Sequence, residues 1–326
     1  MSKASAIVAS AVAPLLTTFG FVVWGEEWKG SAFALNLYKC STAGLLFVLI
    51  SLAQALHLED LISSPLVTTY PLALSSLAGI VVGDNLWLLA LQIIGARRVI
   101  LVDSLKPLLA ALYGELLLRE IVPIVVWVGV FFTCGGIAVV CLERETQPPL
   151  DQSNAGREPA KLLLGYAAAA GNVILDVWGS ALTKNFGQGL TTWEISAVRF
   201  GFAAMVMWVV SLSMREAAIA AKGDGRQALV HFFSGSGAEA QWFNMPSIMS
   251  RGSWVKVSTG VALVTFATPA LSNFGLLRLE LSLALTLSAL GPVYALLLGG
   301  KGVSVRAWIG TVAAVLGVAL VLAFTA

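Results

Sequence analysis

Apolar stretches of membrane length recur along the whole chain. About 20 consecutive apolar residues are enough to cross the hydrocarbon core of a bilayer as a helix. Backbone groups are too costly to leave unpaired in lipid, and a β-barrel would show shorter segments of alternating polarity. The pattern therefore predicts an all-α polytopic membrane protein with ten transmembrane helices. The predicted spans are 5–24, 31–53, 69–92, 97–118, 123–142, 161–184, 191–213, 255–277, 281–299 and 305–325.

Composition supports this prediction and excludes several functions. Of the 326 residues, 58% are hydrophobic and 12% are charged, whereas a soluble domain has about 25% charged residues. A net charge of +2 without any Lys/Arg-rich tract gives no sign of nucleic-acid binding. All three cysteines lie in apolar stretches and both histidines lie in connecting segments. We therefore expect no disulfide framework, no metal site and no cofactor, and we expect membrane lipid as the surroundings.

The two halves of the chain repeat each other. The recurring motifs are Trp127-x-Gly129-x6-Gly136 with Trp308-x-Gly310-x6-Gly317, and Ser104-Leu-Lys-Pro107 with Ser288-Ala-Leu-Gly-Pro292. Each half holds five apolar stretches, and an odd number forces the second half to enter the bilayer from the opposite side. Inverted repeats of this kind are typical of secondary transporters. The sequence thus predicts two inverted five-helix repeats, 1–142 and 161–326, joined by a polar linker at 143–160. The second repeat contains a long connection at 214–254.

Six charged side chains fall inside the apolar stretches. They are Lys39, Asp84, Asp103, Lys106, Asp176 and Arg199. Each would cost about 2.5–3.5 kcal/mol on insertion scales if it faced lipid, so these charges are expected to face a cavity, to pair, or both. Two alternatives stay open. Lys39 and Arg199 could snorkel to an interface, or the charges could form purely structural ion pairs.

Helical spacing groups these charges with polar neighbours. Asp103 and Lys106 are three residues apart and share a face that Tyr113 extends, and Asn172 precedes Asp176 by one turn. Pro107 and Pro292 occupy matching positions in spans 4 and 9, where proline is predicted to kink the helix and free backbone carbonyls. The predicted substrate-binding residues are Lys39, Asp84, Trp87, Asp103, Lys106, Tyr113, Asn172, Asp176, Arg199 and Asn273.

Lysine and arginine are distributed unevenly between the two sets of connections. Of 20 such residues, 13 lie in or beside the connections that include 143–160, four lie on the opposite side and three lie inside spans. By the positive-inside rule, this bias places 143–160 in the cytoplasm and both termini outside.

Four further motifs follow one another in order. They are Gly83-Asp-Asn-Leu-Trp-Leu-Leu-Ala90-Leu, Gly95-Ala-Arg-Arg, Ser104-Leu-Lys-Pro107-Leu-Leu-Ala-Ala and Leu118-Arg-Glu120. Together they resemble the third-to-fifth-span signature of EamA-type members of the drug/metabolite transporter superfamily, and the resemblance extends over nearly the whole chain as two copies. It implies a central cavity formed by spans 1–4 and 6–9, with spans 5 and 10 at the periphery. The second half lacks a counterpart of the Glu120 motif. Family members commonly keep both termini in the cytoplasm, against the charge count.

The resemblance and the intramembrane charges together lead us to expect a secondary transporter rather than an enzyme. It would move a small metabolite by alternating access and without ATP. Three bases against three acids give no clear sign of the substrate's charge, so the choice among an amino acid, another zwitterion and an organic anion stays open. A coupling proton, an exchanged solute and a homodimer are left open, as is the choice between plasma and organelle membrane. The alternatives are an intramembrane lipid-modifying enzyme, although no span contains histidine, and a non-transporting scaffold or receptor.

Overall fold

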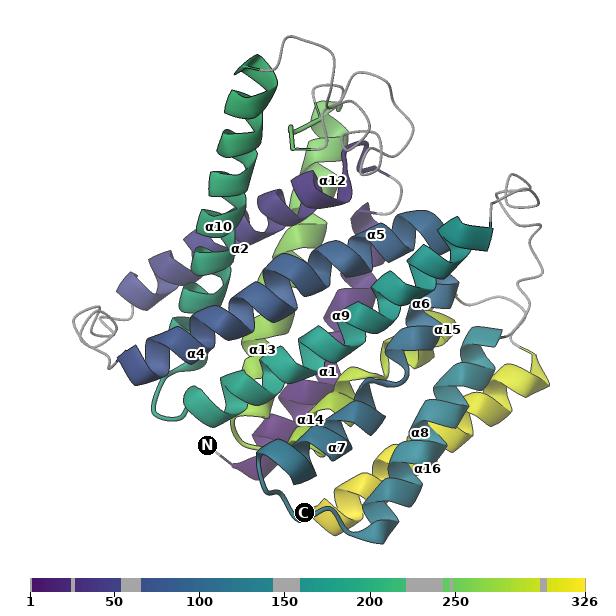
Figure 1. The fold of residues 1–326 in the computed structure, drawn as a ribbon. Coiled ribbons are helices and arrows are strands. Elements are labelled where there is room, and N and C mark those ends of the chain that lie inside the picture. Colours follow the sequence, from purple (N-terminus) through teal and green to yellow (C-terminus); the bar gives the residue numbers. More distant parts are fainter. Residues whose placement is uncertain are drawn as a thin grey trace.

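The computed structural model describes residues 2–24, 27–53, 66–142, 159–220, 243–246, 249–299 and 304–325. Within these ranges the regular structure is entirely helical (Figure 1). Nine helical stretches of the described residues are long and apolar enough to cross a membrane. The remaining predicted span, 97–118, is present as two shorter helices in succession. The prediction of an all-α polytopic membrane protein is confirmed, whereas ten crossings and an inverted repeat remain predictions.

The helices of the first half begin and end close to the predicted spans. The predicted span 69–92 is observed as the continuous helical stretch Leu66–Ile94, but its middle turns are π-helical, and Gly95 ends it with a φ of 81°. The elements are α1 (Lys3–Trp24), α2 (Ala32–Ala53), α4 (Leu66–Ser76), η1 (Leu77–Gly83), α5 (Asp84–Ile94), α6 (Ala96–Asp103), α7 (Lys106–Leu117) and α8 (Ile124–Leu142).

The second half repeats these irregularities at corresponding places. Its third span also contains a π-helical segment, η3, and its fourth span is also divided. The elements are α9 (Pro159–Phe186), α10 (Thr192–Ala220), α12 (Arg251–Val261), η3 (Ala262–Ala267), α13 (Thr268–Leu276), α14 (Leu281–Ser288), α15 (Gly291–Gly299) and α16 (Val305–Thr325). Helix α10 continues beyond the predicted end at 213, so the predicted connection 214–254 begins as helix. Most of that connection, and most of the linker 143–160, lies outside the described residues.

The last helices of the two halves, α8 and α16, pack together at one edge of the molecule (Figure 1). Their glycines meet in antiparallel order, with Gly129 against Gly317 and Gly136 against Gly310. A Cβ on Gly136 would lie 2.4 Å from the backbone nitrogen of Ala314. Such close backbone approach requires small residues. Spans 5 and 10 thus lie at the periphery, as the resemblance implied, and their glycines form the contact between them.

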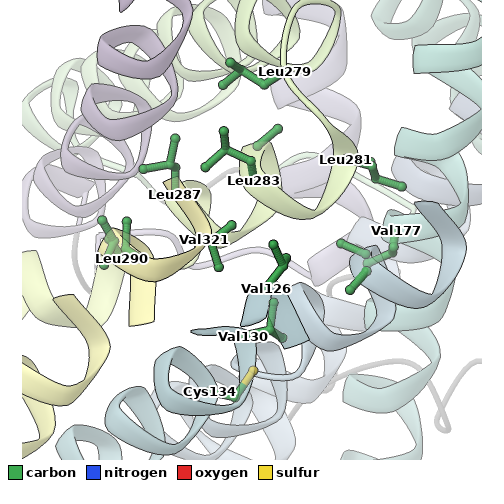
Figure 2. Packing of buried hydrophobic residues seen from close by; sticks show 14 of the residues in the cluster. Val126, Val130, Cys134, Val177, Leu279, Leu281, Leu283, Leu287, Leu290 and Val321 are labelled. Carbon is green, nitrogen blue, oxygen red and sulfur yellow. The ribbon is translucent and has the colours of Figure 1, made fainter. Parts of the chain in front are cut away.

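A buried apolar cluster joins this outer pair to the rest of the protein. Figure 2 shows Leu283 and Leu287 of α14 facing Val126 and Val130 of α8, with Val321 of α16 in the same cluster. A continuously apolar helix can present apolar side chains to neighbouring helices on one face and to lipid on another. This cluster therefore connects α8 and α16 to helices that carry the charged residues.

Helices of one half pack against helices of the other half throughout the fold. Helix α2 packs against α10, α7 against α14, α1 against α13, and α9 against α4, η1 and α5. The antiparallel pairing of α8 with α16 is the arrangement expected if the halves have opposite orientations. The two ends of the chain also meet, because Lys3 Nζ donates a hydrogen bond to the Thr325 carbonyl oxygen at 2.6 Å.

Candidate functional site

The first of the predicted charges forms an ion pair between the second and third spans. Lys39 Nζ of α2 lies 3.1 Å from Asp84 Oδ2, at the start of α5. The Lys39 side chain is only 5% exposed, whereas Asp84 is 30% exposed. Lys39 therefore does not snorkel to an interface. Its charge is held inside the protein by a carboxylate that other groups can still reach.

A second network surrounds Lys106 at the break between α6 and α7. Lys106 Nζ lies 3.4 Å from Asp103 Oδ1 and 3.0 Å from Asp176 Oδ2 of α9. The Trp87 indole donates a hydrogen bond to Asp103 Oδ2 at 2.8 Å. The exposed fractions of Asp103, Lys106 and Asp176 are 20%, 23% and 34%, so this network is also only partly enclosed.

The interruption between α6 and α7 lies beside the proline that was predicted to kink this span, but its geometry is not that of a mid-helix kink. Pro107 lies in the first turn of α7, after a turn at Ser104–Leu105. Proline is well tolerated in a first turn because its missing N–H would be unpaired there anyway. Pro292 follows a matching interruption between α14 and α15. At both prolines the α-helix is thus interrupted by a turn through which some backbone hydrogen bonds continue. Thr18 donates a hydrogen bond to the carbonyl oxygen of Gly291 at 3.2 Å.

The π-helical segment η1 ends directly before Asp84 and shapes this part of the site. Asn36 donates a hydrogen bond to the Ile80 carbonyl oxygen within η1 at 2.9 Å. Two glycines of η1 face α9: a Cβ on Gly79 would lie in ordinary van der Waals contact with Asp176 Cα at 3.8 Å, and a Cβ on Gly83 with Asn172 Nδ2 at 3.5 Å. Single π-helical turns often occur at functional sites, where they redirect side chains.

Arg199 is the third cation of the predicted set, and it differs from the two lysines. It is 8% exposed, and within the described part of the chain no carboxylate lies within 4.0 Å of its guanidinium. Its Nε is buried without a hydrogen-bond partner among those residues. The Nη2 atom lies beside Gly79, where an added Cβ would be 3.4 Å away. The acids that act on its charge are Asp176 and Asp84, from beyond ion-pair distance.

Residues 4–142 match the family model described as "EamA-like transporter family". This part of the chain, less than half of its length, is thus similar to the EamA-like transporter family. Together with the nine described helical stretches that are long and apolar enough to cross a membrane, this match supports an integral multi-pass membrane protein. The match contains α1 to α8, and with them the Lys39–Asp84 pair and the Asp103–Lys106 pair.

Comparison with whole proteins adds information about the fold. No curated protein matches the chain, whereas 20 chains of solved structures do. One of these, described only as "Crystal structure of protein", has a TM-score of 0.70 and 20% identity over 99% of this chain and 98% of its own. This likeness extends the shared fold beyond the EamA-like unit at 4–142 to both halves of the chain.

The other predicted site residues differ in how close they lie to the charge cluster formed by Lys39, Asp84, Asp103, Lys106, Asp176 and Arg199. Asn172 Oδ1 is buried without a hydrogen-bond partner in the described part of the chain, next to η1. Asn273 donates a hydrogen bond to Ser196 Oγ of α10 at 3.0 Å. Tyr113 packs against the apolar cluster of α8 and α14, on the same helix as Lys106. Thr183, at the end of the Asn172–Asp176 stripe, meets Ser75 Oγ at 2.7 Å, so that end joins α9 to α4.

The sequence reasoning missed a polar network at the end of the fold where the termini lie. Glu120 of the EamA-like motif accepts hydrogen bonds from the Leu281 backbone N–H at 3.1 and 2.9 Å and lies 3.2 Å from Lys184 Nζ. Lys184 also donates to the carbonyl oxygens of Leu276 and Leu279. The signal available was Glu120 in the family motif, but its partners are distant in sequence and resemble ordinary loop charges. Among the described residues, no group of His, Cys, Asp and Glu could hold a metal ion.

Proposed function

We propose that this protein is a secondary carrier that moves a small polar metabolite across the membrane by alternating access. The observation that carries the proposal is the partly exposed Asp103–Lys106–Asp176 network at a break within the fourth span. Charges at membrane depth mark substrate or ion pathways, and broken helices build the binding sites of many transporters. No step requires ATP.

Alternation is supported by polar contacts between the two halves at both ends of the helices. At the end with the termini, Glu120 of the first half meets Lys184 and Leu281 of the second. At the opposite end, Glu27 pairs with Lys256 at 2.6 Å. Contacts of this kind can open at one end while they hold at the other, as two gates around one site must.

The matching irregularities of the two halves supply places where the helices can bend. π-Helical segments occur at Leu77–Gly83 and Ala262–Ala267, and breaks occur before Lys106 and Gly291. Each lacks the regular hydrogen bonding that stiffens an α-helix, so bending there costs less than elsewhere. A substrate bound between these segments would be exposed to either side by small rotations of one half against the other.

The test is transport by the purified full-length protein in liposomes. We expect accumulation or exchange of a metabolite from a mixed pool under an imposed pH or solute gradient, measured by mass spectrometry of the lumen. Lys106→Gln and Asp176→Asn should lower the rate at least tenfold. The exposed Arg278, outside the charge cluster, provides the control Arg278→Gln, which should transport normally. A scaffold or receptor predicts no uptake by any variant, and an intramembrane enzyme predicts altered lipid instead.

A further inference from the structure

Oxygen atoms gather where α1 meets the π-helical segment of the second half. Thr17 Oγ1 of α1 lies 3.0 Å from Thr268 Oγ1, and each of these hydroxyls lies 3.2 Å from the Ala13 carbonyl oxygen. Thr268 Oγ1 also lies 3.0 Å from the carbonyl oxygen of Leu263, in η3. These four atoms, called the oxygen cluster below, come from α1, η3 and α13. The fold thus brings two hydroxyls and two carbonyls together at one place.

The oxygen cluster has more acceptors than hydrogens. Four close contacts link its oxygens, but Thr17 and Thr268 supply only one hydroxyl proton each. At least two of the contacts therefore lack a proton of their own. An ordinary hydroxyl-to-backbone bond, such as that from Thr259 to the Val255 carbonyl on α12, uses one proton for one acceptor. A cation among the four oxygens would satisfy all of them at once.

The spacing of these oxygens suits a small cation of low charge. Thr17 Oγ1, Thr268 Oγ1 and the Ala13 oxygen form a triangle with sides of 3.0, 3.2 and 3.2 Å. As one face of an octahedron, this triangle places a cation about 2.2 Å from each oxygen, between the distances typical of Mg²⁺ and Ca²⁺. Divalent ions are bound mainly through carboxylates, whereas all four oxygens here are neutral. Na⁺ is close to Ca²⁺ in size and carries half its charge, so it fits best.

The oxygen cluster lies on the inner side of α1. The outer face of this helix is marked by its exposed large apolar residues, which are Val8, Phe19 and Val22. Thr17 lies on the opposite face, together with Phe21 one turn later. Phe21 stacks on Trp87, whose indole binds Asp103. Thr17 and Thr268 are both half-buried, so water can complete the coordination of an ion beside the charge network.

The oxygen cluster occupies places that carry acids in the first half of the chain. Thr268 directly follows η3, as Asp84 directly follows η1. Thr17 lies one turn before the glycine that packs α1 against η3, as Asp176 lies one turn before the glycine that packs α9 against η1. These glycines are Gly20 and Gly179. The acids of the first half have lysines as counter-ions, whereas the neutral oxygens of the second half would take their cation from solution.

We propose that the oxygen cluster is a Na⁺ site and that Na⁺ is the coupling ion of the carrier. Backbone carbonyls at irregular helix segments coordinate Na⁺ in other secondary transporters. The site joins α1 to η3, so a bound ion would favour the conformation in which these two elements lie close together. This inference rests on the proposed carrier function and specifies the gradient that drives it.

The test measures the thermal stability of the full-length protein in detergent, in NaCl, KCl and N-methylglucamine chloride at equal ionic strength. An ion that binds the folded state raises the melting temperature as its concentration rises. We expect Na⁺ to do so in a saturable way, and we expect K⁺ and N-methylglucamine not to. Equal melting temperatures in the three salts would overturn the proposal, as would stabilisation by K⁺ or Ca²⁺ without stabilisation by Na⁺.

Substitutions separate ion binding from helix packing. Thr268→Val keeps the shape of the side chain and removes one ligand, so the Na⁺ concentration that gives half of the shift should rise at least tenfold. Thr17→Val should act in the same way, whereas Thr268→Ser keeps the hydroxyl and should retain most of the affinity. Thr259→Val is the matched control, because it removes a hydroxyl that binds only its own helix at an exposed position. If Thr268→Val lowers the melting temperature equally in Na⁺ and K⁺ and leaves the Na⁺ dependence unchanged, the hydroxyl is structural and the proposal is wrong.

Transport in liposomes distinguishes failure of this inference from failure of the carrier function. An inward Na⁺ gradient should drive metabolite uptake, and a Na⁺ ionophore should abolish that uptake. If a metabolite is taken up equally with and without Na⁺, the protein is a carrier and the coupling role of Na⁺ is wrong. If Na⁺ stabilises the protein but no metabolite moves under any gradient, the ion site stands, and the carrier function is wrong together with the coupling assigned to it.

Discussion

At the scale of single residues, the Lys39–Asp84 pair shows how the free-energy cost of burying a charge in this fold depends on one contact. Lys39 is almost fully enclosed, so it depends on Asp84 for compensation. Breaking a buried pair from one side costs about 3–5 kcal/mol, whereas removing both charges is often tolerated. The partial exposure of Asp84 places the expected cost near the lower end.

We therefore predict that Asp84→Asn destabilises the protein by about 3 kcal/mol, because it leaves the Lys39 charge without its partner. The combination of Lys39→Met with Asp84→Asn should recover most of that loss. Thermal unfolding in detergent measures both. If the double variant is no more stable than Asp84→Asn alone, the pair is not what holds Lys39 inside the protein.

Glu280 gives the fold a pH dependence at the end where the termini lie. It precedes α14, outside the membrane-spanning segments, and its Oε2 is buried without a partner among the described residues. Burial raises the pKa of Glu280 above its ordinary value of 4.5, and the negative charge of Glu120 raises it further against the opposing effects of Lys3 and Lys184. The folded state thus favours the protonated carboxyl. That stabilisation is fully present below the unfolded pKa and is lost as pH rises through the folded pKa.

Glu280→Gln should accordingly raise the melting temperature at about pH 8 and change it little at about pH 4, because the neutral amide imitates the protonated acid. A series of thermal scans between these values tests the prediction. Glu115→Gln, at an exposed position on α7, is the matched control and should show no such trend. A melting temperature that falls at the higher pH in Glu280→Gln would contradict the sign of the pKa shift.

The sequence was enough to single out the charged residues of the candidate site, whose role stays a prediction, but not their division into pairs. The rule that charge is costly in lipid singled out all six, and helical spacing predicted that Asp103 and Lys106 would meet. It could not show that Asp176 joins Lys106 and leaves Arg199 without a partner, because that depends on how α9 crosses η1. Tyr113 shares a helix with Lys106, yet its described packing is apolar.

At the scale of elements, the glycines of α8 and α16 allow a paired test of close packing. A Cβ on Gly136 would lie 2.5 Å from the Gly310 carbonyl oxygen, whereas a Cβ on the adjacent Gly135 would have nothing within 4 Å. We predict that Gly136→Ala destabilises the protein by about 1–3 kcal/mol, the usual cost of overpacking, and that Gly135→Ala does not. Unfolding midpoints of the two variants decide the matter. Equal midpoints would mean that the helices separate without cost.

Hydropathy predicted the positions of the membrane-length elements well and their irregularities poorly. Apolar length alone placed helix ends within a few residues, as at Ala32–Ala53 and Ile124–Leu142. The π-helical turns at Leu77–Gly83 leave no such signal, since a changed hydrogen-bond register does not alter which residues are apolar. Pro107 and Pro292 predicted the places at which spans 4 and 9 are interrupted. That each proline lies in the first turn of the following helix depends on tertiary packing.

At the scale of the whole molecule, the meeting of Lys3 with Thr325 predicts that both ends of the chain lie on one side of the membrane. Reporter fusions at each terminus should therefore report the same compartment, as an even number of crossings requires. We expect that compartment to be the cytoplasm, as is common among EamA-type proteins, although the lysine and arginine count favours the opposite side. Reporters in different compartments would rule out ten crossings.

The closeness of the two ends also means that the order of the halves along the chain is not fixed by the fold. A short peptide between Thr325 and Lys3 could close the chain, and a cut between Leu142 and Pro159 would create new ends, giving a circular permutant that begins with α9. Chain ends that lie close together generally tolerate rearrangement of the chain. Membrane insertion of this permutant would test whether the EamA-like half must be synthesised first, or whether either half can support the insertion of the other.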